Sequence, residues 1–267
     1  MLHIFTYCTD QDKVKLLEKS AQLKNIRLQI IYEPQSEYKG FTNKIFKMKE
    51  AILQNENILE NDMILFVDAY DVLCFAGSEQ EIIDKFHSYD CDLLMGAELN
   101  SYPYGYDDKY PPAGHNPTNY KYINSGGFIG YKSAIVKLYS WKTDDEIIHI
   151  CSDGGDQTYF IQYYLVHYNK NVKMDYNQMV FQNMFLASWY DFVIKNGRLY
   201  NTILKQYPCF IHFNGLSHQT DTNANIMEVF VDKLTKSILE SEYDKCFDFT
   251  EYKKSTWPNP TIIPQLR

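Results

Sequence analysis

The chain has 267 residues, enough for one large domain or two small ones with a sizeable buried core. Hydrophobic residues make up 45% and charged residues 22%, a globular composition that excludes disordered and fibrous classes. The formal charge of −8 argues against a protein that binds nucleic-acid backbones, but it leaves open a small anionic ligand held through a metal ion.

The sequence shows no membrane span, no secretory signal and no cysteine motif. The longest apolar runs stop well short of the roughly 18 residues that a membrane span needs, so no transmembrane segment is expected. The first ten residues lack the basic region and long apolar stretch of a secretory signal, and localisation is left unassigned. The six cysteines form no C-x-x-C pair, which argues against a structural zinc site and indicates no disulfide framework.

Predicted strands and helices alternate along the first part of the chain. The predicted strands cover residues 2–8, 28–32, 63–67 and 91–96. Asp10 is a candidate cap for the first helix, residues 44–53 form the second, and Ser78 with Glu81 forms a capping box for a third that runs to about Phe86. This alternation predicts parallel β-α-β units, whose ligands bind beyond the carboxyl ends of the strands.

The second part begins with a long loop at residues 99–118, rich in Tyr, Pro, Gly, Asp and Asn. Its length predicts either a lid over a site or simple packing of a long loop. Beyond it we expect a glycine-bearing strand, a helix, an Asn-Gly hairpin, a buried strand and a last helix at residues 124–131, 156–168, 191–201, 209–213 and 226–239. We expect one domain over residues 1–250 and a proline-containing tail at 251–267.

The apolar strand at residues 63–67 ends in two carboxylates, Asp68 and Asp71. Two carboxylates at one sheet edge repel each other unless a cation lies between them. Mg²⁺ and Mn²⁺ prefer such oxygen ligands and share them with substrate phosphates. The D-x-x-D spacing therefore indicates a metal site, with an ordinary turn or helix cap as the alternative.

The buried strand at residues 209–213 contains His212 and is followed by Asn214 and Gly215. A histidine at a strand end before a glycine-bearing turn can reach the same sheet edge as the carboxylates. By itself it would better suit a hydrogen-bonded structural histidine. The two strand ends together favour the metal site.

Two further segments stand out. Residues 122–130 read Y-I-N-S-G-G-F-I-G, and the paired glycines suggest that the backbone closely approaches a ligand or another strand. They match neither the dinucleotide fingerprint nor the P-loop. Asp156 comes at the start of a predicted helix, where the helix dipole favours a carboxylate, so it is either a site residue or a plain helix-terminal acid.

In this order, D-A-Y-D at 68–71, I-N-S-G-G-F-I-G at 123–130, Asp156-Gln157 and H-F-N-G at 212–215 resemble the glycosyltransferase domain of the procollagen lysyl hydroxylases, the multifunctional collagen-modifying enzymes. The resemblance spans roughly residues 1–220. It implies an α/β, GT-A-like fold, a Rossmann-type mixed and mostly parallel sheet flanked by helices. It also implies Mn²⁺ (or Mg²⁺) and transfer of glucose or galactose from a UDP-sugar to hydroxylysine or galactosyl-hydroxylysine of collagen-like protein.

The resemblance also implies a role for each candidate residue. The metal ligands would be Asp68, Asp71 and His212. Tyr70 would stack on the nucleotide base. The remaining residues of the donor pocket would be Thr6, Lys44, Asn214, Gly215 and His218. Near the transferred sugar and the acceptor would lie Asn124 and Asp156, and Asp156 could contact an acceptor amine, stabilise a cationic sugar or act as a general base.

Three departures from the family pattern bear on the acceptor and the leaving group. His218 stands where the family has a basic residue, and a neutral histidine holds a diphosphate less well, so either His218 is protonated or Lys44 compensates. Gly154 and Gly155 interrupt an acidic run, and residues 101–110 replace a tryptophan-bearing gate loop. The alternatives are therefore a GT-A transferase for another acceptor (glycan, lipid or non-collagen protein), a non-catalytic UDP-sugar-binding domain, or a plain interaction protein. Nucleic-acid partners are not expected, and the oligomeric state is left unassigned.

Overall fold

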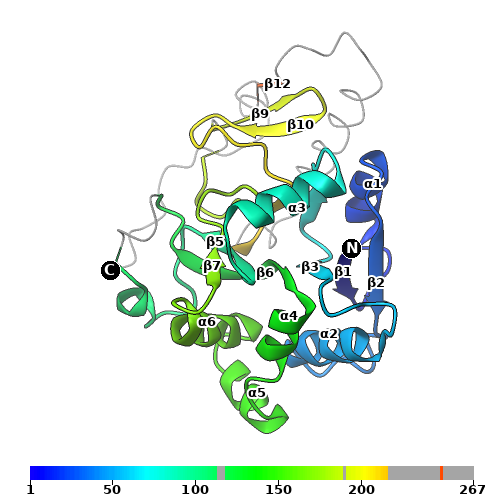
Figure 1. The fold of residues 1–267 in the computed structure, drawn as a ribbon, viewed down its shortest axis with the longest axis vertical. Helices are drawn as coiled ribbons and strands as arrows, with labels where there is room; N and C mark the ends of the chain where they lie inside the picture. Colours follow the sequence, from blue (N-terminus) through cyan, green and yellow to red (C-terminus); the bar gives the residue numbers. More distant parts are fainter. Residues whose placement is uncertain (113–117, 189–190, 216–246, 249–267) are drawn as a thin grey trace.

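The fold is built around a mixed sheet, seen in a computed structural model that describes residues 1–112, 118–188, 191–215 and 247–248. The sheet has six strands in the order β2-β1-β3-β6-β5-β7 (Figure 1). Its strands are β1 (Leu2–Cys8), β2 (Leu28–Tyr32), β3 (Met63–Val67), β5 (Leu93–Glu98), β6 (Tyr122–Tyr131) and β7 (Val172–Met174). β6 pairs antiparallel with β3 and β5, while the remaining pairings of this sheet are parallel. This confirms the predicted α/β class, with a mixed and mostly parallel sheet flanked by helices.

Helices cover both faces of the sheet, and the alternation of side chains along β3 shows why (Figure 1). Ile64 and Phe66 pack into the cluster formed with α2 (Thr42–Gln54), α4 (Lys132–Tyr139), α5 (Asp144–Cys151) and α6 (Asp156–His167). Met63, Leu65 and Val67 pack on the other face with α1 (Lys15–Leu23) and α3 (Glu79–Ser88). All residues of β3 are buried, which confirms the prediction of a strand covered on both faces.

Two smaller sheets extend the fold beside the carboxyl ends of the main strands. One has the order β4-β11-β8, formed by β4 (Val72–Cys74), β11 (Phe210–His212) and β8 (Phe181–Asn183). The other has the order β10-β9-β12, formed by β10 (Arg198–Asn201), β9 (Phe192–Lys195) and β12 (Phe247–Asp248). Ile211 of β11 packs with Phe192 and Leu199 between these sheets. The register of β9 with β10 confirms the hairpin predicted at Asn196-Gly197.

Several predicted boundaries are wrong, and local hydrogen bonds explain two of them. α1 begins at Lys15 without a side-chain cap, because Asp10 instead accepts a hydrogen bond from the Asp12 N–H within a turn. Ser78 caps α3 as predicted, whereas the Glu81 carboxylate accepts from the Gly77 N–H rather than completing the capping box. β5 ends at Glu98, two residues later than expected, and this carries a carboxylate to the edge of the sheet.

The remaining predictions concern parts of the chain that are not described. The helix expected at residues 226–239 and the tail at 251–267 lie outside the described residues, so the domain boundaries stay a prediction. Among the described helices, none is both long enough and apolar enough to cross a membrane.

Candidate functional site

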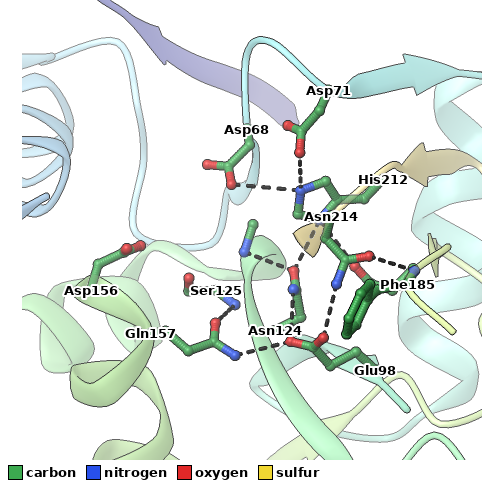
Figure 2. A network of polar contacts seen from close by, with 12 residues as sticks. Asp68, Asp71, Glu98, Asn124, Ser125, Asp156, Gln157, Phe185, His212 and Asn214 are labelled. Carbon is green, nitrogen blue, oxygen red and sulfur yellow. Dashed lines mark hydrogen bonds and ion pairs between the residues drawn. The ribbon is translucent and has the colours of Figure 1, made fainter. Parts of the chain in front are cut away.

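Asp68, Asp71 and His212 form what we call the triad corner, at the carboxyl edge of β3. Asp68 follows β3 directly, and Asp71 precedes β4, which pairs with β11 so that Val72 lies opposite His212. Each side chain offers an oxygen or nitrogen atom, and these atoms all lie within 4.8 Å of one another (Figure 2). The two motifs that the sequence singled out are therefore brought to one point.

The charges at the triad corner are strongly coupled. His212 Nε2 lies 3.0 Å from Asp71 Oδ2 and 3.8 Å from Asp68 Oδ2. Burial lowers the pKa of His212, but the carboxylates of Asp71 and Asp68 outweigh burial and raise it above its ordinary value. Burial also raises the pKa of Asp68, and the nearby positive charges of Lys44 and His212 oppose this. A positive charge between the two carboxylates is therefore strongly favoured.

The donor atoms of the triad corner fit a divalent cation. Two carboxylates and an imidazole form a ligand set of oxygen and nitrogen that Mn²⁺ and Mg²⁺ accept. The backbone of β6 leaves room for them, because a Cβ at Gly126 would lie 2.1 Å from His212 Cε1 and 2.7 Å from Asp68 Oδ2. A Cβ at Gly127 would lie 2.6 Å from Phe181 Cδ1. The paired glycines thus allow the predicted close approach, and the metal-ligand roles stay a prediction.

Lys44 links the triad corner to the start of α6. Its Nζ lies 2.9 Å from Asp68 Oδ1 and 2.6 Å from Asp156 Oδ2. Burial lowers the pKa of Lys44, but the charges of Asp156 and Asp68 outweigh burial and raise it, so the ammonium stays charged. Gly155 precedes Asp156 with φ 70° and ψ −157°, a conformation that is open essentially to glycine alone. The glycine that breaks the family's acidic run therefore shapes the backbone at Asp156.

Tyr70 and Thr6, both expected in the nucleotide pocket, lie on the β1 side of the corner. The Tyr70 hydroxyl accepts hydrogen bonds from the Thr9 N–H at 2.7 Å and the Asp10 N–H at 2.9 Å, which ties the D-A-Y-D turn to the end of β1. Thr6 is fully buried, and its Oγ1 has no hydrogen-bond partner among the described residues. Their roles in binding a nucleotide stay a prediction.

Glu98 is a buried carboxylate that the sequence analysis missed. Its Oε1 accepts hydrogen bonds from Asn124 Nδ2 and Gln157 Nε2, both at 3.0 Å, and its Oε2 accepts from Asn214 Nδ2 at 2.8 Å (Figure 2). Burial raises the pKa of Glu98 to about 7 although the amide donors oppose it. Extending the predicted strand by two residues would have placed this carboxylate at the sheet edge, next to the other candidates.

Asn214 and Gly215 anchor the chain where β11 ends. Asn214 Oδ1 accepts hydrogen bonds from the backbone N–H groups of Met184 at 3.1 Å and Phe185 at 3.0 Å. A Cβ at Gly215 would lie 2.8 Å from the Phe185 ring. The side chain of Asn214 is thus committed to holding neighbouring segments. His218 lies outside the described residues.

The described part of the long loop, residues 99–112, is here called the tyrosine loop. The hydroxyl of Tyr110 accepts a hydrogen bond from the Ile123 N–H at 3.0 Å, and the hydroxyl of Tyr106 accepts one from Gln162 Nε2 at 2.9 Å. Tyr102 and Tyr104 are instead 51% and 77% exposed. The loop reaches the turn before Asp156, because a Cβ at Gly154 would lie 2.6 Å from Pro103 Cγ. Packing therefore accounts for Tyr106 and Tyr110, and a lid role stays a prediction.

Comparison with known protein families assigns the chain to one of them. The family model described as the PLOD GT domain matches residues 1–237. The chain therefore belongs to the PLOD GT-domain family, a family of glycosyltransferase domains. This confirms the resemblance that the four motifs carry.

The curated relatives include collagen-modifying enzymes. The chain is 30% identical over 232 residues to procollagen-lysine,2-oxoglutarate 5-dioxygenase 1 of Gallus gallus, an alignment that covers 80% of the chain and 30% of the relative. It is 32% identical over 165 residues to the multifunctional procollagen lysine hydroxylase and glycosyltransferase LH3 of Homo sapiens, covering 58% and 21%. An uncharacterized protein, R699 of Acanthamoeba polyphaga mimivirus, is 29% identical over 211 residues, covering 76% and 43%. The chain thus spans less than half the length of these relatives.

Solved structures give more distant matches. A glycosyltransferase involved in the glycosylation of the major capsid of PBCV-1 superposes with a TM-score of 0.48 at 14% identity, over 85% of this chain and 98% of that one. The apo form of the glycosyltransferase GlyE of Streptococcus pneumoniae TIGR4 gives a TM-score of 0.45 at 12% identity, over 98% and 66%.

Proposed function

We propose that this protein is a metal-dependent hexosyltransferase that moves glucose or galactose from a UDP-sugar to hydroxylysine or galactosyl-hydroxylysine of a collagen-like protein. Membership of the family supports the class of reaction. The observation that carries the metal dependence is the triad corner, where ligand atoms of two acids and a histidine lie within 4.8 Å of one another. Procollagen-modifying relatives support the acceptor.

Asp68, Asp71 and His212 would hold Mn²⁺ or Mg²⁺. A bound cation would supply charge neutralisation for the UDP leaving group. The two carboxylate oxygens of Asp68 have different partners, because Oδ1 faces Lys44 and Oδ2 faces His212. Lys44 therefore adds a second positive charge beside the corner, which favours the binding of a diphosphate and offsets a neutral side chain at position 218.

Asp156 would act on the acceptor side of the site. It is the first residue of α6 and is paired with Lys44, and Figure 2 shows it on the opposite side of Asp68 from Asp71. From there its carboxylate could contact an acceptor amine, stabilise positive charge on the sugar, or accept a proton in an inverting reaction. Thr6, Tyr70, Asn214, Gly215 and His218 would complete the donor pocket.

Asn124 was expected near the transferred sugar, and its contacts narrow that role. Its Oδ1 accepts from the Gly126 N–H and lies 3.0 Å from His212 Nδ1, while its Nδ2 donates to Glu98. A direct contact with the sugar would require Asn124 to give up one of these bonds. We therefore propose that Asn124 supports the site chiefly through His212.

The decisive experiment measures UDP release from UDP-glucose and UDP-galactose with Mn²⁺, with and without peptides that carry hydroxylysine or galactosyl-hydroxylysine. We expect release that depends on both Mn²⁺ and one of the peptides. The Asp71→Ala variant should lose it, whereas Asp108→Ala, in the exposed part of the tyrosine loop, should keep it. The proposal is wrong if the intact protein releases no UDP in any arm.

A transferase for another acceptor is the second candidate, favoured by the exposed Tyr102 and Tyr104 in place of the family's gate loop. Release of UDP with glycan, lipid or other protein acceptors, but not with collagen-like peptides, would identify it. Calorimetry separates the non-catalytic alternative, which predicts tight Mn²⁺-dependent binding of UDP without turnover. A plain interaction protein would bind no UDP.

A further inference from the structure

We propose that Asn183 and Asn124 are positioning residues that hold an N–H at Nδ1 of His212 and so leave Nε2 as the nitrogen that can exchange its proton for a cation beside Asp68 and Asp71. The purpose of this arrangement, metal binding, rests on the proposed function. The arrangement itself rests on the contacts of His212 and can be tested without it.

Strand pairing places the two amides around the imidazole. In the small sheet His212 of β11 is in register with Asn183 of β8, so their side chains are direct neighbours. Asn124 approaches from β6 of the main sheet. His212 Nδ1 lies 3.0 Å from Asn183 Oδ1 and 3.0 Å from Asn124 Oδ1. All three side chains are nearly inaccessible, with His212 and Asn124 each 6% exposed and Asn183 1% exposed.

The orientation of each amide is fixed by partners other than His212. Asn183 Nδ2 donates to the Ala97 carbonyl at 2.8 Å, so turning this amide would place its oxygen against another acceptor. Asn124 Nδ2 donates to Glu98, and Asn124 Oδ1 accepts from the Gly126 N–H at 3.0 Å. Turning that amide would place oxygen against a carboxylate and NH₂ against an N–H. Both oxygens must therefore face His212.

Two acceptors facing Nδ1 require a proton on that nitrogen. A deprotonated Nδ1 would put its lone pair against two carbonyl oxygens in a buried place, where unmatched polar groups are costly. An N–H at Nδ1 satisfies both oxygens instead. Nε2 lies 3.0 Å from Asp71 and 3.8 Å from Asp68, so it donates to Asp71 while it is protonated. With Nδ1 committed to the amides, Nε2 is the nitrogen left for a cation that replaces this proton.

Glu98 in turn holds Asn124, one of the two amides that contact His212. It accepts from Asn124, and the same carboxylate is held by Gln157 and Asn214. Asn214 lies two residues after His212, so the network joins the main sheet to the end of β11. Metal-binding histidines generally donate the other ring N–H to such a partner, and loss of the partner weakens metal binding by about 10–100-fold.

The test reads the ring directly by ¹⁵N and ¹³C NMR of labelled histidine in the full chain. Spectra are recorded without metal and with diamagnetic Zn²⁺. We expect a protonated Nδ1 for His212 in both spectra, with Nε2 protonated in the absence of metal and metal-bound in the presence of Zn²⁺. A proton on Nε2 with a bare Nδ1 in the metal-free spectrum overturns the inference.

Variants separate positioning from a merely structural role. Asn183→Leu removes one acceptor, so we expect faster exchange of the Nδ1 proton and about 10-fold weaker Mn²⁺ binding, with Asn124 still in place. Asn201→Leu is the matched control, because Asn201 is 2% exposed and its amide bonds to Gln182 and to backbone N–H groups.

The outcomes distinguish this inference from the proposed function. If the wild-type chain binds no Mn²⁺ by calorimetry, the metal dependence fails while the NMR result still decides whether Nδ1 carries a proton. If Asn183→Leu binds Mn²⁺ as tightly as the wild type and its Nδ1 proton exchanges no faster, Asn183 has no positioning role and the inference is wrong.

Discussion

The triad corner and the tyrosine loop differ in what holds them in place. Strand register fixes the corner, since Asp71 leads into β4 and His212 pairs with that strand. The tyrosine loop is held by the hydroxyls of Tyr106 and Tyr110, and its tip leaves Tyr102 and Tyr104 exposed. Groups that must meet within a few tenths of an ångström are carried by strands, whereas a surface that meets variable partners is carried by a loop. Changes in the two regions should therefore have separable effects.

The largest effect is expected from Gly126→Ala. The added methyl carbon would lie 2.1 Å from His212 Cε1, so the imidazole must leave its position. We expect Mn²⁺ affinity to fall by about 100-fold or more, and transfer activity with it. Calorimetric titration of the purified variant measures this.

Gly155→Ala is the matched change on the other side of the site. It forces alanine into a conformation that suits glycine and should cost about 1–3 kcal/mol of stability, yet leave Mn²⁺ affinity within about 2-fold of the wild type. A similar loss of Mn²⁺ affinity in both alanine variants would show that the corner is not held separately.

Lys44→Met should produce the next largest effect, because Lys44 connects the triad corner to the start of α6. Its removal leaves Asp68 and Asp156 as two partly buried carboxylates without their shared cation. We expect the free energy of unfolding in urea to fall by roughly 3 kcal/mol. Adding Asp156→Asn should recover part of the loss, and purely additive losses would contradict a shared pairing.

A pH-dependent change in stability is expected from Glu98. Burial raises its pKa from an ordinary 4.5 to about 7 in the folded protein. Between these values the unfolded chain releases the proton that the folded chain keeps, so this contribution to stability is full below pH 4.5 and is lost as the pH rises to about 7. The loss is at most about 3 kcal/mol.

Urea unfolding of the wild type and of Glu98→Gln across this pH range measures the difference. Glutamine does not titrate, so the gap between the two free energies of unfolding should change with pH and level off above about 7. A gap that is constant from pH 4.5 upward would contradict the raised pKa.

The smallest effect on stability is expected from Tyr102→Ala and Tyr104→Ala. Both side chains are exposed, so the free energy of unfolding should change by less than about 0.5 kcal/mol and Mn²⁺ affinity should stay the same. A lid role predicts a several-fold rise in KM for the acceptor. Tyr110→Phe is the control, because it removes a hydroxyl that anchors the loop, costs about 1 kcal/mol and should leave that KM unchanged.

Much of the fold could be predicted because its long elements have clear patterns. The continuous apolar runs of β1 and β3 and the glycine-bearing β6 were located to within two residues. The strands β4, β7 and β8 have three residues each, too few for any periodicity to appear. A register shift between Met95 and Gly96 interrupts β5, where the predicted strand stopped. That shortened prediction hid Glu98.

The candidate site likewise contains residues that local motifs predict and residues that only non-local strand pairing places. D-x-x-D and the histidine strand are local patterns, so their residue types alone indicate a cation site. Their meeting depends on the pairing of β11 with β4, which is non-local. Asn183 carries no motif, and its place beside His212 follows only from the register of β8. Residues that support others through long-range pairing leave little trace in one sequence.

The order β4-β11-β8 has a consequence for how the chain is made. Its middle strand comes last in the sequence, and His212 lies 141 residues after Asp71. A ribosome therefore releases both β4 and β8 before the strand that joins them, β4 by far the earlier, and until then each lacks its partner strand and has an edge open to wrong pairing. When residues 210–212 pair between β4 and β8, the same step completes the small sheet and places His212 beside Asp71. The triad corner therefore cannot form until this part of the nascent chain has folded.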